Sequence, residues 1–147
     1  MRHLKFYFAV LLLTFCLSVK AQVDTIQVQS ASMSKSIKNV VITPDGYNGT
    51  KAFPVVYLLH GAGGNYSGWI KQVPQLKAYA DANQVIIVCP DGGRTSWYWD
   101  SPIDESMKYE TYVAKELISA IDSRYKTIAS PKGRAITGLS MGGHGAF

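Results

Sequence analysis

The chain has 147 residues, of which 47% are hydrophobic and 17% charged, and its formal net charge at pH 7 is +5. This length allows one domain, and the composition excludes a disordered chain, a collagen-like repeat and a disulfide scaffold. Three basic residues and no acidic residue lie in positions 1–21, so residues 22–147 hold 12 basic and 10 acidic side chains. Such a small, dispersed excess excludes a surface that follows nucleic-acid phosphates.

Residues 1–21 have the pattern of a secretory signal peptide. Two positive charges within residues 1–5 precede an uncharged apolar run at 6–19, and Ala21 offers a cleavage point. The apolar run is shorter than the roughly 20 residues of a spanning helix, although a retained signal anchor is the alternative. Phe15 before Cys16 disfavours lipid attachment at that cysteine. We therefore expect a secreted or periplasmic protein without a stable membrane anchor after cleavage.

The cysteines predict no internal disulfide. Cys16 would leave with the signal, and Cys89 would then be the single cysteine of the mature chain. Cys89 ends an apolar segment, where a buried structural thiol is the usual role. Without a cluster of His, Cys and carboxylate residues at ligand spacing, we expect no metal site.

The segments after position 22 predict strands followed by alternating helices and strands. Residues 25–30 alternate in polarity and residues 37–43 are β-branched, which predicts two half-exposed antiparallel strands. Later apolar runs are typical of parallel strands, and helices are predicted where apolar residues recur every three or four positions. The runs are 53–59, 85–89 and 134–139, and the helices are 75–83 and 109–125. This order predicts an α/β fold, with a mostly parallel sheet and helices on both faces.

A G-x-S-x-G motif at residues 138–142 carries the chemistry. It follows a predicted strand and precedes a small-residue segment that can start a helix. Its two glycines permit a sharp turn that lifts the Ser140 hydroxyl clear of the sheet, and the following helix would direct N–H groups toward it. We predict that Ser140 is a nucleophile; the alternative is a tight structural turn.

A glycine-rich loop at residues 60–64 directly follows the first of the apolar runs. Such a loop can aim a backbone N–H at the position that Ser140 would occupy. The motif predicts an oxyanion hole formed by the N–H groups of Ala62 and Met141, and losing one such donor costs about 3–4 kcal/mol. The alternative, a phosphate-binding loop, lacks the required Lys-Ser/Thr pair and the dinucleotide spacing.

Three segments, 54–69, 88–102 and 136–147, together resemble the α/β-hydrolase superfamily. More narrowly, they are similar to an esterase branch that includes esterase D, bacterial feruloyl and acetyl-xylan esterases, tributyrin esterases and the antigen 85 mycolyltransferases. The resemblance covers nearly all of the chain after the signal. It implies Ser140 as the nucleophile and Ala62 and Met141 as the oxyanion donors, and it implies no cofactor.

The resemblance also implies that the loop at 91–100 borders the mouth of the site. Arg94, Trp97, Tyr98 and Trp99 would then contact an aromatic acyl group or a sugar. The alternative is that these aromatic side chains cap the core.

The acid and the base that activate a serine are not found after Ser140. In this fold they follow the nucleophile in the order acid, then His, yet none of the seven residues after Ser140 is acidic. His144 would lie one turn along the same helix, so we interpret it as a packing residue. We expect His60 to have a structural hydrogen-bonding role, and Asp91 and Asp100 precede the nucleophile.

We therefore expect residues 22–147 to be the N-terminal part of an esterase domain whose C-terminal strands and helices are missing. The strand at 134–139 would then be an apolar edge, and this polypeptide alone would have little activity. The expected function is a secreted serine carboxylic-ester hydrolase that acts through an acyl-enzyme on acyl or feruloyl esters of carbohydrate. The alternatives are an acyltransferase of the same branch and a non-catalytic carbohydrate-binding remnant. The sequence predicts no oligomeric state.

Overall fold

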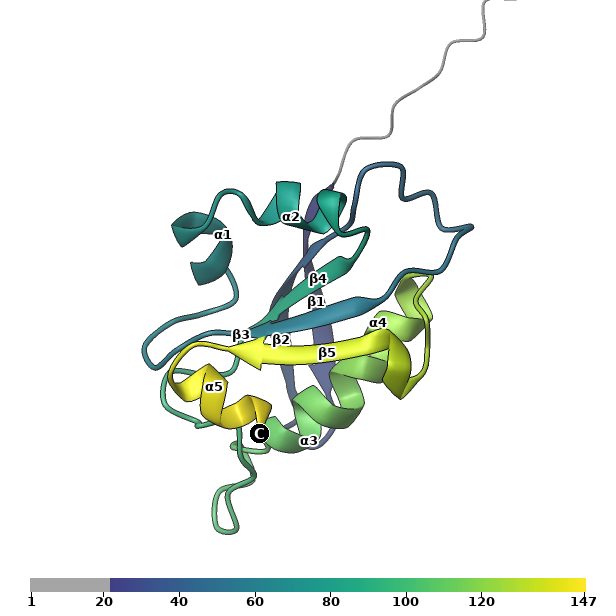
Figure 1. Cartoon of the computed structure of the whole chain (residues 1–147). Coiled ribbons are helices and arrows are strands. Elements are labelled where there is room, and N and C mark those ends of the chain that lie inside the picture. The colour runs from purple at the N-terminus through teal and green to yellow at the C-terminus, as the bar shows by residue number, and fades with distance from the viewer. Residues whose placement is uncertain (1–21) are drawn as a thin grey trace, which may run out of the picture.

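A five-stranded mixed sheet forms the centre of the molecule in the computed structural model, which describes residues 22–147 (Figure 1). The strands are β1 (Val23–Ser30), β2 (Lys35–Ile42), β3 (Val55–Leu59), β4 (Ile86–Pro90) and β5 (Arg134–Gly138). Their order is β1-β2-β4-β3-β5; β1, β2 and β4 pair antiparallel, whereas β4, β3 and β5 pair in parallel. The predicted antiparallel pair and the parallel strands are confirmed, and the predicted signal peptide lies outside the described residues.

Short helices follow each of the parallel strands. They are α1 (Gly68–Gln72), α2 (Leu76–Ala82), α3 (Tyr109–Thr111), α4 (Ile118–Arg124) and α5 (Met141–Ala146). A π-helix, η1 (Tyr112–Leu117), joins α3 to α4, and a 3-10 turn, η2 (Pro131–Gly133), precedes β5. The helices predicted at 75–83 and 109–125 are confirmed, whereas α1 was not predicted. Within residues 22–147, no helix combines the length and the apolar character needed to cross a bilayer.

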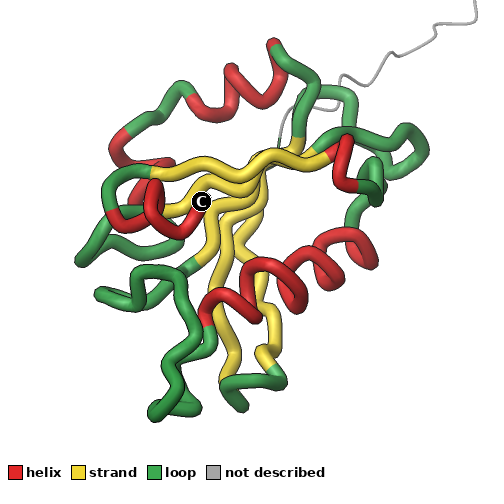
Figure 2. Tube along the Cα trace, turned by 60° about the horizontal axis from the view of Figure 1, so that its bottom comes forward, coloured by secondary structure: helices red, strands yellow, loops and turns green. Residues whose placement is uncertain are grey.

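Helices cover both faces of the sheet, as Figure 2 shows, and β4 is buried along its whole length. Because side chains alternate along a strand, Ile86 and Val88 join the core beneath η1 and α4, whereas Ile87 and Cys89 pack with α2. Burying one such aliphatic side chain stabilises the fold by about 1.5–3 kcal/mol. Burial on both faces holds the parallel strands in place, and the candidate active site lies at the carboxyl ends of these strands.

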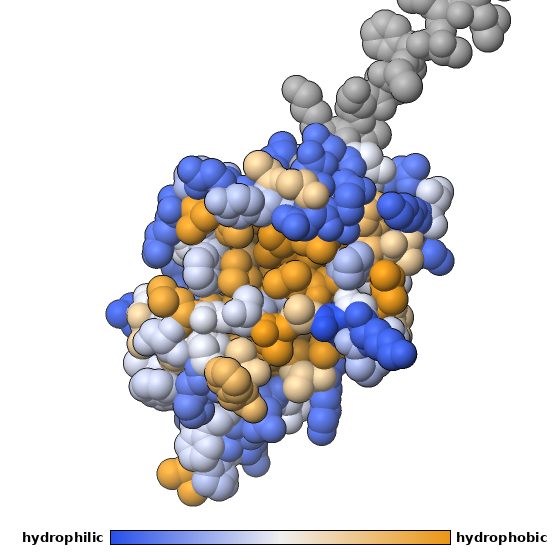
Figure 3. All heavy atoms as spheres, in the orientation of Figure 1, coloured by the Kyte–Doolittle hydropathy of each residue, from blue (hydrophilic) through white to orange (hydrophobic). Residues whose placement is uncertain are grey.

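The strand β5 has an exposed apolar side. In the described residues it pairs with β3 alone, and Ile136 and the following Leu139 are 42% and 56% exposed. Figure 3 shows hydrophobic side chains across the middle of the face where Figure 1 places β5 in front. The apolar edge expected at 134–139 is therefore present.

A half-buried carboxylate joins the first hairpin to the π-helix. Glu116 in η1 accepts hydrogen bonds from the Ser30 hydroxyl (2.6 Å) and from the Ser32 N–H (2.8 Å). The Ser30 hydroxyl in turn accepts the Met33 N–H (3.2 Å). Hydrogen bonds to a charged acceptor are stronger than neutral ones. The turn between β1 and β2 is thereby fixed against the helix layer.

Candidate active site

Ser140 lies at a strained corner between β5 and α5. Its backbone has φ 52° and ψ −113°, a left-handed conformation that is unfavourable for a residue other than glycine. Such conformations cost about 1–3 kcal/mol and persist only where the surrounding structure fixes them. The side chain of Ser140 is exposed. The corner therefore presents the hydroxyl outward at the carboxyl end of the sheet, as the motif predicted.

The two glycines of the motif allow this corner to form. A Cβ at Gly138 would lie 2.5 Å from the carbonyl carbon of Gly142, and a Cβ at Gly142 would lie 2.7 Å from that of Leu59. Both obstacles are backbone atoms, which cannot rotate away as a side chain can. The close approach of β5, α5 and the end of β3 therefore requires glycine at both positions.

The glycine-rich loop at 60–64 lies directly against the corner. A Cβ at Gly61 would lie 3.7 Å from Cβ of Ser140. The Gly63 N–H donates to the Arg94 carbonyl (2.7 Å) and the Gly64 N–H donates to the Gly61 carbonyl (3.1 Å). Among residues 22–147, neither the Ala62 N–H nor the Met141 N–H donates to a protein acceptor. The structure thus places Gly61, which precedes Ala62, against Ser140, and it leaves the N–H groups of Ala62 and Met141 without a protein acceptor in the described residues.

The ring of His60 is held by two hydrogen bonds. The Gly92 N–H donates to Nε2 (2.9 Å), so Nδ1 carries the ring proton and donates to the Gly61 carbonyl (2.8 Å). The imidazole is also buried. These contacts confirm a structural hydrogen-bonding role for His60, which fixes the loop rather than accepting a proton from serine.

The remaining candidates for acid and base are engaged elsewhere. His144 contacts Trp97, with Nδ1 3.0 Å from the Trp97 carbonyl oxygen and the two rings edge to face. Burial opposes ionisation of Asp100, but hydrogen bonds from the Thr111 hydroxyl (2.5 Å) and N–H (3.0 Å) hold its pKa below the ordinary value. Asp91 accepts the N–H of Gly93 (2.9 Å). The packing interpretation of His144 fits this placement. Asp100 binds Thr111 in α3, and Asp91 binds within its own loop, where its Oδ1 lies 4.0 Å from Nε2 of His60.

The loop at 91–100 divides its side chains between surface and interior. Arg94, Trp97 and Trp99 are exposed, and the two tryptophans border a cavity of about 360 Å³ beside α5. Tyr98 is only 4% exposed, and its hydroxyl accepts the His60 N–H (3.0 Å). This placement fits the core-packing alternative for Tyr98 rather than the predicted substrate contact, because the hydroxyl is used within the protein.

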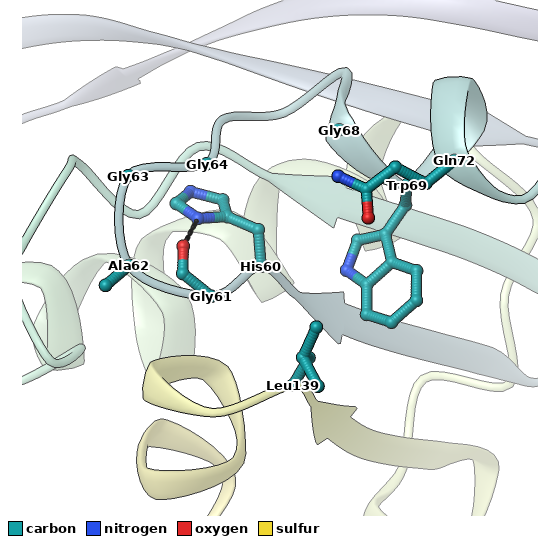
Figure 4. Close-up of a pocket in the computed structure, with 9 residues that line it drawn as sticks. All are labelled: His60, Gly61, Ala62, Gly63, Gly64, Gly68, Trp69, Gln72 and Leu139. Atoms are coloured by element: carbon teal, nitrogen blue, oxygen red, sulfur yellow. Dashed lines mark hydrogen bonds between the residues drawn. The ribbon is translucent and has the colours of Figure 1, made fainter.

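A cavity of about 280 Å³ lies between the glycine-rich loop and α1 (Figure 4). Besides the loop, its walls include Trp69, Gln72 and Leu139. The Trp69 indole N–H donates to the Leu59 carbonyl oxygen (3.1 Å), and the Leu139 N–H donates to the same oxygen (3.3 Å). Trp69 was not predicted as a site residue, although it ends the first of the three segments that carry the resemblance.

The described part of the chain holds no group of three or more His, Cys, Asp or Glu residues that could bind a metal ion. Cys89 is buried, and burial raises the pKa of its thiol to about 12. A thiol in this environment stays protonated and is a poor nucleophile. Of the two candidate nucleophiles, Cys89 and Ser140, only the exposed hydroxyl of Ser140 is accessible from the surface.

A mixed sheet whose parallel strands lead to a strained serine corner beside a glycine-rich loop defines an α/β-hydrolase. The family model described as "Putative esterase" matches residues 30–147, and the chain belongs to this esterase family.

Relatives and solved structures agree with this family. The chain is 34% identical over 111 residues to the esterase Rv1288 of Mycobacterium tuberculosis, covering 73% of this chain and 24% of that protein. It is 32% identical over 134 residues to the diacylglycerol acyltransferase/mycolyltransferase Ag85C of Mycobacterium avium, covering 85% of this chain and 35% of that protein. A ferulic acid esterase structure is 32% identical with a TM-score of 0.75, covering 87% of this chain and 54% of that one.

The fold also matches an S-formylglutathione hydrolase from Agrobacterium tumefaciens, with a TM-score of 0.74 at 22% identity, covering 87% of this chain and 52% of that one. The chain thus spans about half the length of these solved structures and a quarter to a third of the two mycobacterial proteins.

Proposed function

We propose that the full-length protein is a serine carboxylic-ester hydrolase. The observation that carries this proposal is Ser140 at a strained corner, beside a loop that offers the Ala62 N–H. Ser140 Oγ attacks the ester carbonyl, and the carbonyl oxygen gains negative charge in the tetrahedral intermediate. The N–H groups of Ala62 and Met141 donate to that oxygen. The alcohol then leaves, and water releases the acid from the acyl-enzyme.

The base that takes the serine proton, and the acid that orients it, lie outside residues 22–147 in this proposal. The support is that His60 and His144 are both engaged with backbone carbonyls. The relatives, which extend well beyond the matched region, are consistent with it. Residues 22–147 alone would therefore bind esters but turn them over slowly.

The proposed substrates are acyl or feruloyl esters of carbohydrate outside the cell. Support comes from the signal pattern in residues 1–21, from the similarity to a ferulic acid esterase, and from the exposed Arg94 and Trp97 beside the site. Secretion is tested by mass spectrometry of the mature N-terminus in the medium or periplasm. A protein that begins at Gln22 supports it, whereas a cell-associated protein that retains residues 1–21 contradicts it.

An acyltransferase is the second candidate, supported by the 32% identity to Ag85C. A sugar hydroxyl would then replace water as the acceptor, and the roles of Ser140, Ala62 and Met141 would be the same. Product analysis with an acceptor sugar in the assay separates the two reactions. Acylated sugar as the main product supports transfer, and free acid supports hydrolysis.

The nucleophile is tested in the full-length protein with a fluorophosphonate probe and with p-nitrophenyl acetate. Ser140→Ala is expected to abolish both labelling and turnover, because it removes the attacking oxygen. Ser119→Ala is the matched control, since Ser119 is exposed on α4. Turnover or labelling that survives in Ser140→Ala would refute the assignment, and an unlabelled wild-type protein would favour a non-catalytic remnant.

A further inference from the structure

Two consecutive aromatic residues after β4 adopt a left-handed backbone, with φ 54° at Trp97 and 58° at Tyr98. Bulky residues rarely adopt this conformation, and it persists only where neighbouring contacts hold it. The buried hydroxyl of Ser96 supplies such contacts, because it accepts the Tyr98 N–H (3.0 Å) and donates to the Gly92 carbonyl. The loop is therefore braced in the form that turns Tyr98 inward.

Tyr98 contacts three separate segments. Its hydroxyl oxygen accepts the His60 N–H at 3.0 Å and lies 3.3 Å from the His60 carbonyl oxygen, to which it donates. Its ring packs on two glycines: a Cβ at Gly92 would lie 2.5 Å from the hydroxyl oxygen, and a Cβ at Gly145 would lie 2.7 Å from Cγ. Tyr98 thus joins the glycine-rich loop, the loop after β4 and the helix α5.

These contacts lie close to both predicted oxyanion donors. His60 is two residues before Ala62, and Gly145 lies on the helix that begins at Met141. Burial raises the pKa of the Tyr98 hydroxyl well above its ordinary value, so the hydroxyl stays protonated and keeps both hydrogen bonds at neutral pH. A single rigid side chain therefore spans the two elements that carry the two N–H groups.

We propose that Tyr98 is a positioning residue that sets the separation of the Ala62 and Met141 N–H groups. This inference rests on the proposed esterase function. Tyr98 touches no reacting atom, so its effect appears where negative charge develops on the carbonyl oxygen. Loss of its hydroxyl therefore weakens binding of the transition state more than binding of the ester.

The test uses the full-length protein and Tyr98→Phe, which keeps the ring against the two glycines and removes the hydroxyl. We expect kcat for p-nitrophenyl acetate to fall about 10–100-fold, with KM changed by less than about twofold. Affinity for phenylboronic acid, which forms a negatively charged tetrahedral adduct with serine, is expected to fall by a similar factor. A merely structural role would not give this separation of kcat from KM.

Tyr112→Phe is the matched control. Tyr112 is also buried, and its hydroxyl donates to Asn39 (2.9 Å) between η1 and β2, without contact to the glycine-rich loop. We expect this variant to lose some stability but to keep its kcat and its affinity for the boronic acid. Equal losses of kcat in the two variants would indicate general loosening and would overturn the proposal.

The outcomes separate this inference from the proposed function. If wild-type Ser140 is labelled and active but Tyr98→Phe keeps wild-type kcat and boronic-acid affinity, the positioning role is overturned and the esterase function stands. If the wild-type protein is neither labelled nor active, the esterase function fails, and the positioning role fails with it. If Tyr98→Phe does not fold, Ser96→Ala is the second test, because the Ser96 hydroxyl accepts the Tyr98 N–H and holds Tyr98 in its inward position. A severalfold lower kcat at constant KM supports the positioning role of Tyr98, and an unchanged kcat overturns it.

Discussion

Gly142→Ala tests the close packing of the serine corner. The new Cβ would lie 2.7 Å from the Leu59 carbonyl carbon and closer still to its oxygen, so an ordinary contact of 3.4 Å requires α5 to move away from β3 by at least about 0.7 Å. Overpacking of this kind costs about 1–3 kcal/mol, which exceeds the helix propensity gained by alanine, about 1 kcal/mol at most. Because α5 carries Met141, we also expect kcat to fall by up to about 100-fold.

Gly143→Ala is the matched control, one residue further along the same helix. Its Cβ would meet the Gly138 carbonyl oxygen at 3.4 Å, an ordinary contact, so we expect it to leave the free energy of unfolding unchanged or to raise it by up to about 1 kcal/mol. Urea unfolding of the two full-length variants measures the difference. Equal stabilities would refute the argument that backbone approach, rather than backbone flexibility, requires glycine at position 142.

Three further predictions concern the thiol, the hairpin and the aromatic loop. The pKa of Cys89 is about 12 in the folded protein against 9.0 ordinarily, so its stabilising contribution is complete below pH 9 and is lost as the pH rises toward 12. Between pH 9 and 11, urea unfolding should show the free energy of unfolding falling less steeply with pH in Cys89→Ala than in the wild type, by about 1.4 kcal/mol per pH unit. The same pH dependence in both proteins would contradict the argument from burial of the thiol. Glu116→Ala should lower the free energy of unfolding by about 1–3 kcal/mol, because the buried Ser30 hydroxyl loses the carboxylate that accepts its hydrogen bond. Lys115 is exposed on the same helix, so Lys115→Ala should change the free energy of unfolding by less than about 0.5 kcal/mol. Trp97→Ala should reduce kcat/KM for a feruloyl ester more than for an acetate; equal losses would assign Trp97 to packing against His144.

The parallel strands and the serine corner were predictable because their signals are local. A continuous apolar run identified β4, and the two glycines around Ser140 marked a close backbone approach that the structure contains. The helix α1 was missed because it has five residues and none of them is buried, so it leaves no apolar periodicity. The π-helix η1 was also missed, since its apolar side chains lie at nearly the same spacing as in an α-helix.

The inward position of Tyr98 could not be predicted from its own segment. Its sequence neighbours Trp97 and Trp99 are equally aromatic, yet both are exposed. The difference comes from a positive φ and from Gly92 and Gly145, which provide space for the ring. These glycines lie 6 residues before and 47 residues after Tyr98, so only the tertiary structure shows that they share one neighbour.

The carbonyl oxygen of Leu59 couples the wall of the cavity to the serine corner. It accepts both the Trp69 indole N–H and the Leu139 N–H, and a carbonyl oxygen has two lone pairs, so both are occupied. A bulky group that pushes against the Trp69 indole would therefore act on the Leu59 carbonyl oxygen, which also accepts the N–H of Leu139, the residue before Ser140. We therefore expect a group large enough to displace the indole to shift Leu139, and with it the neighbouring Ser140, through this shared acceptor.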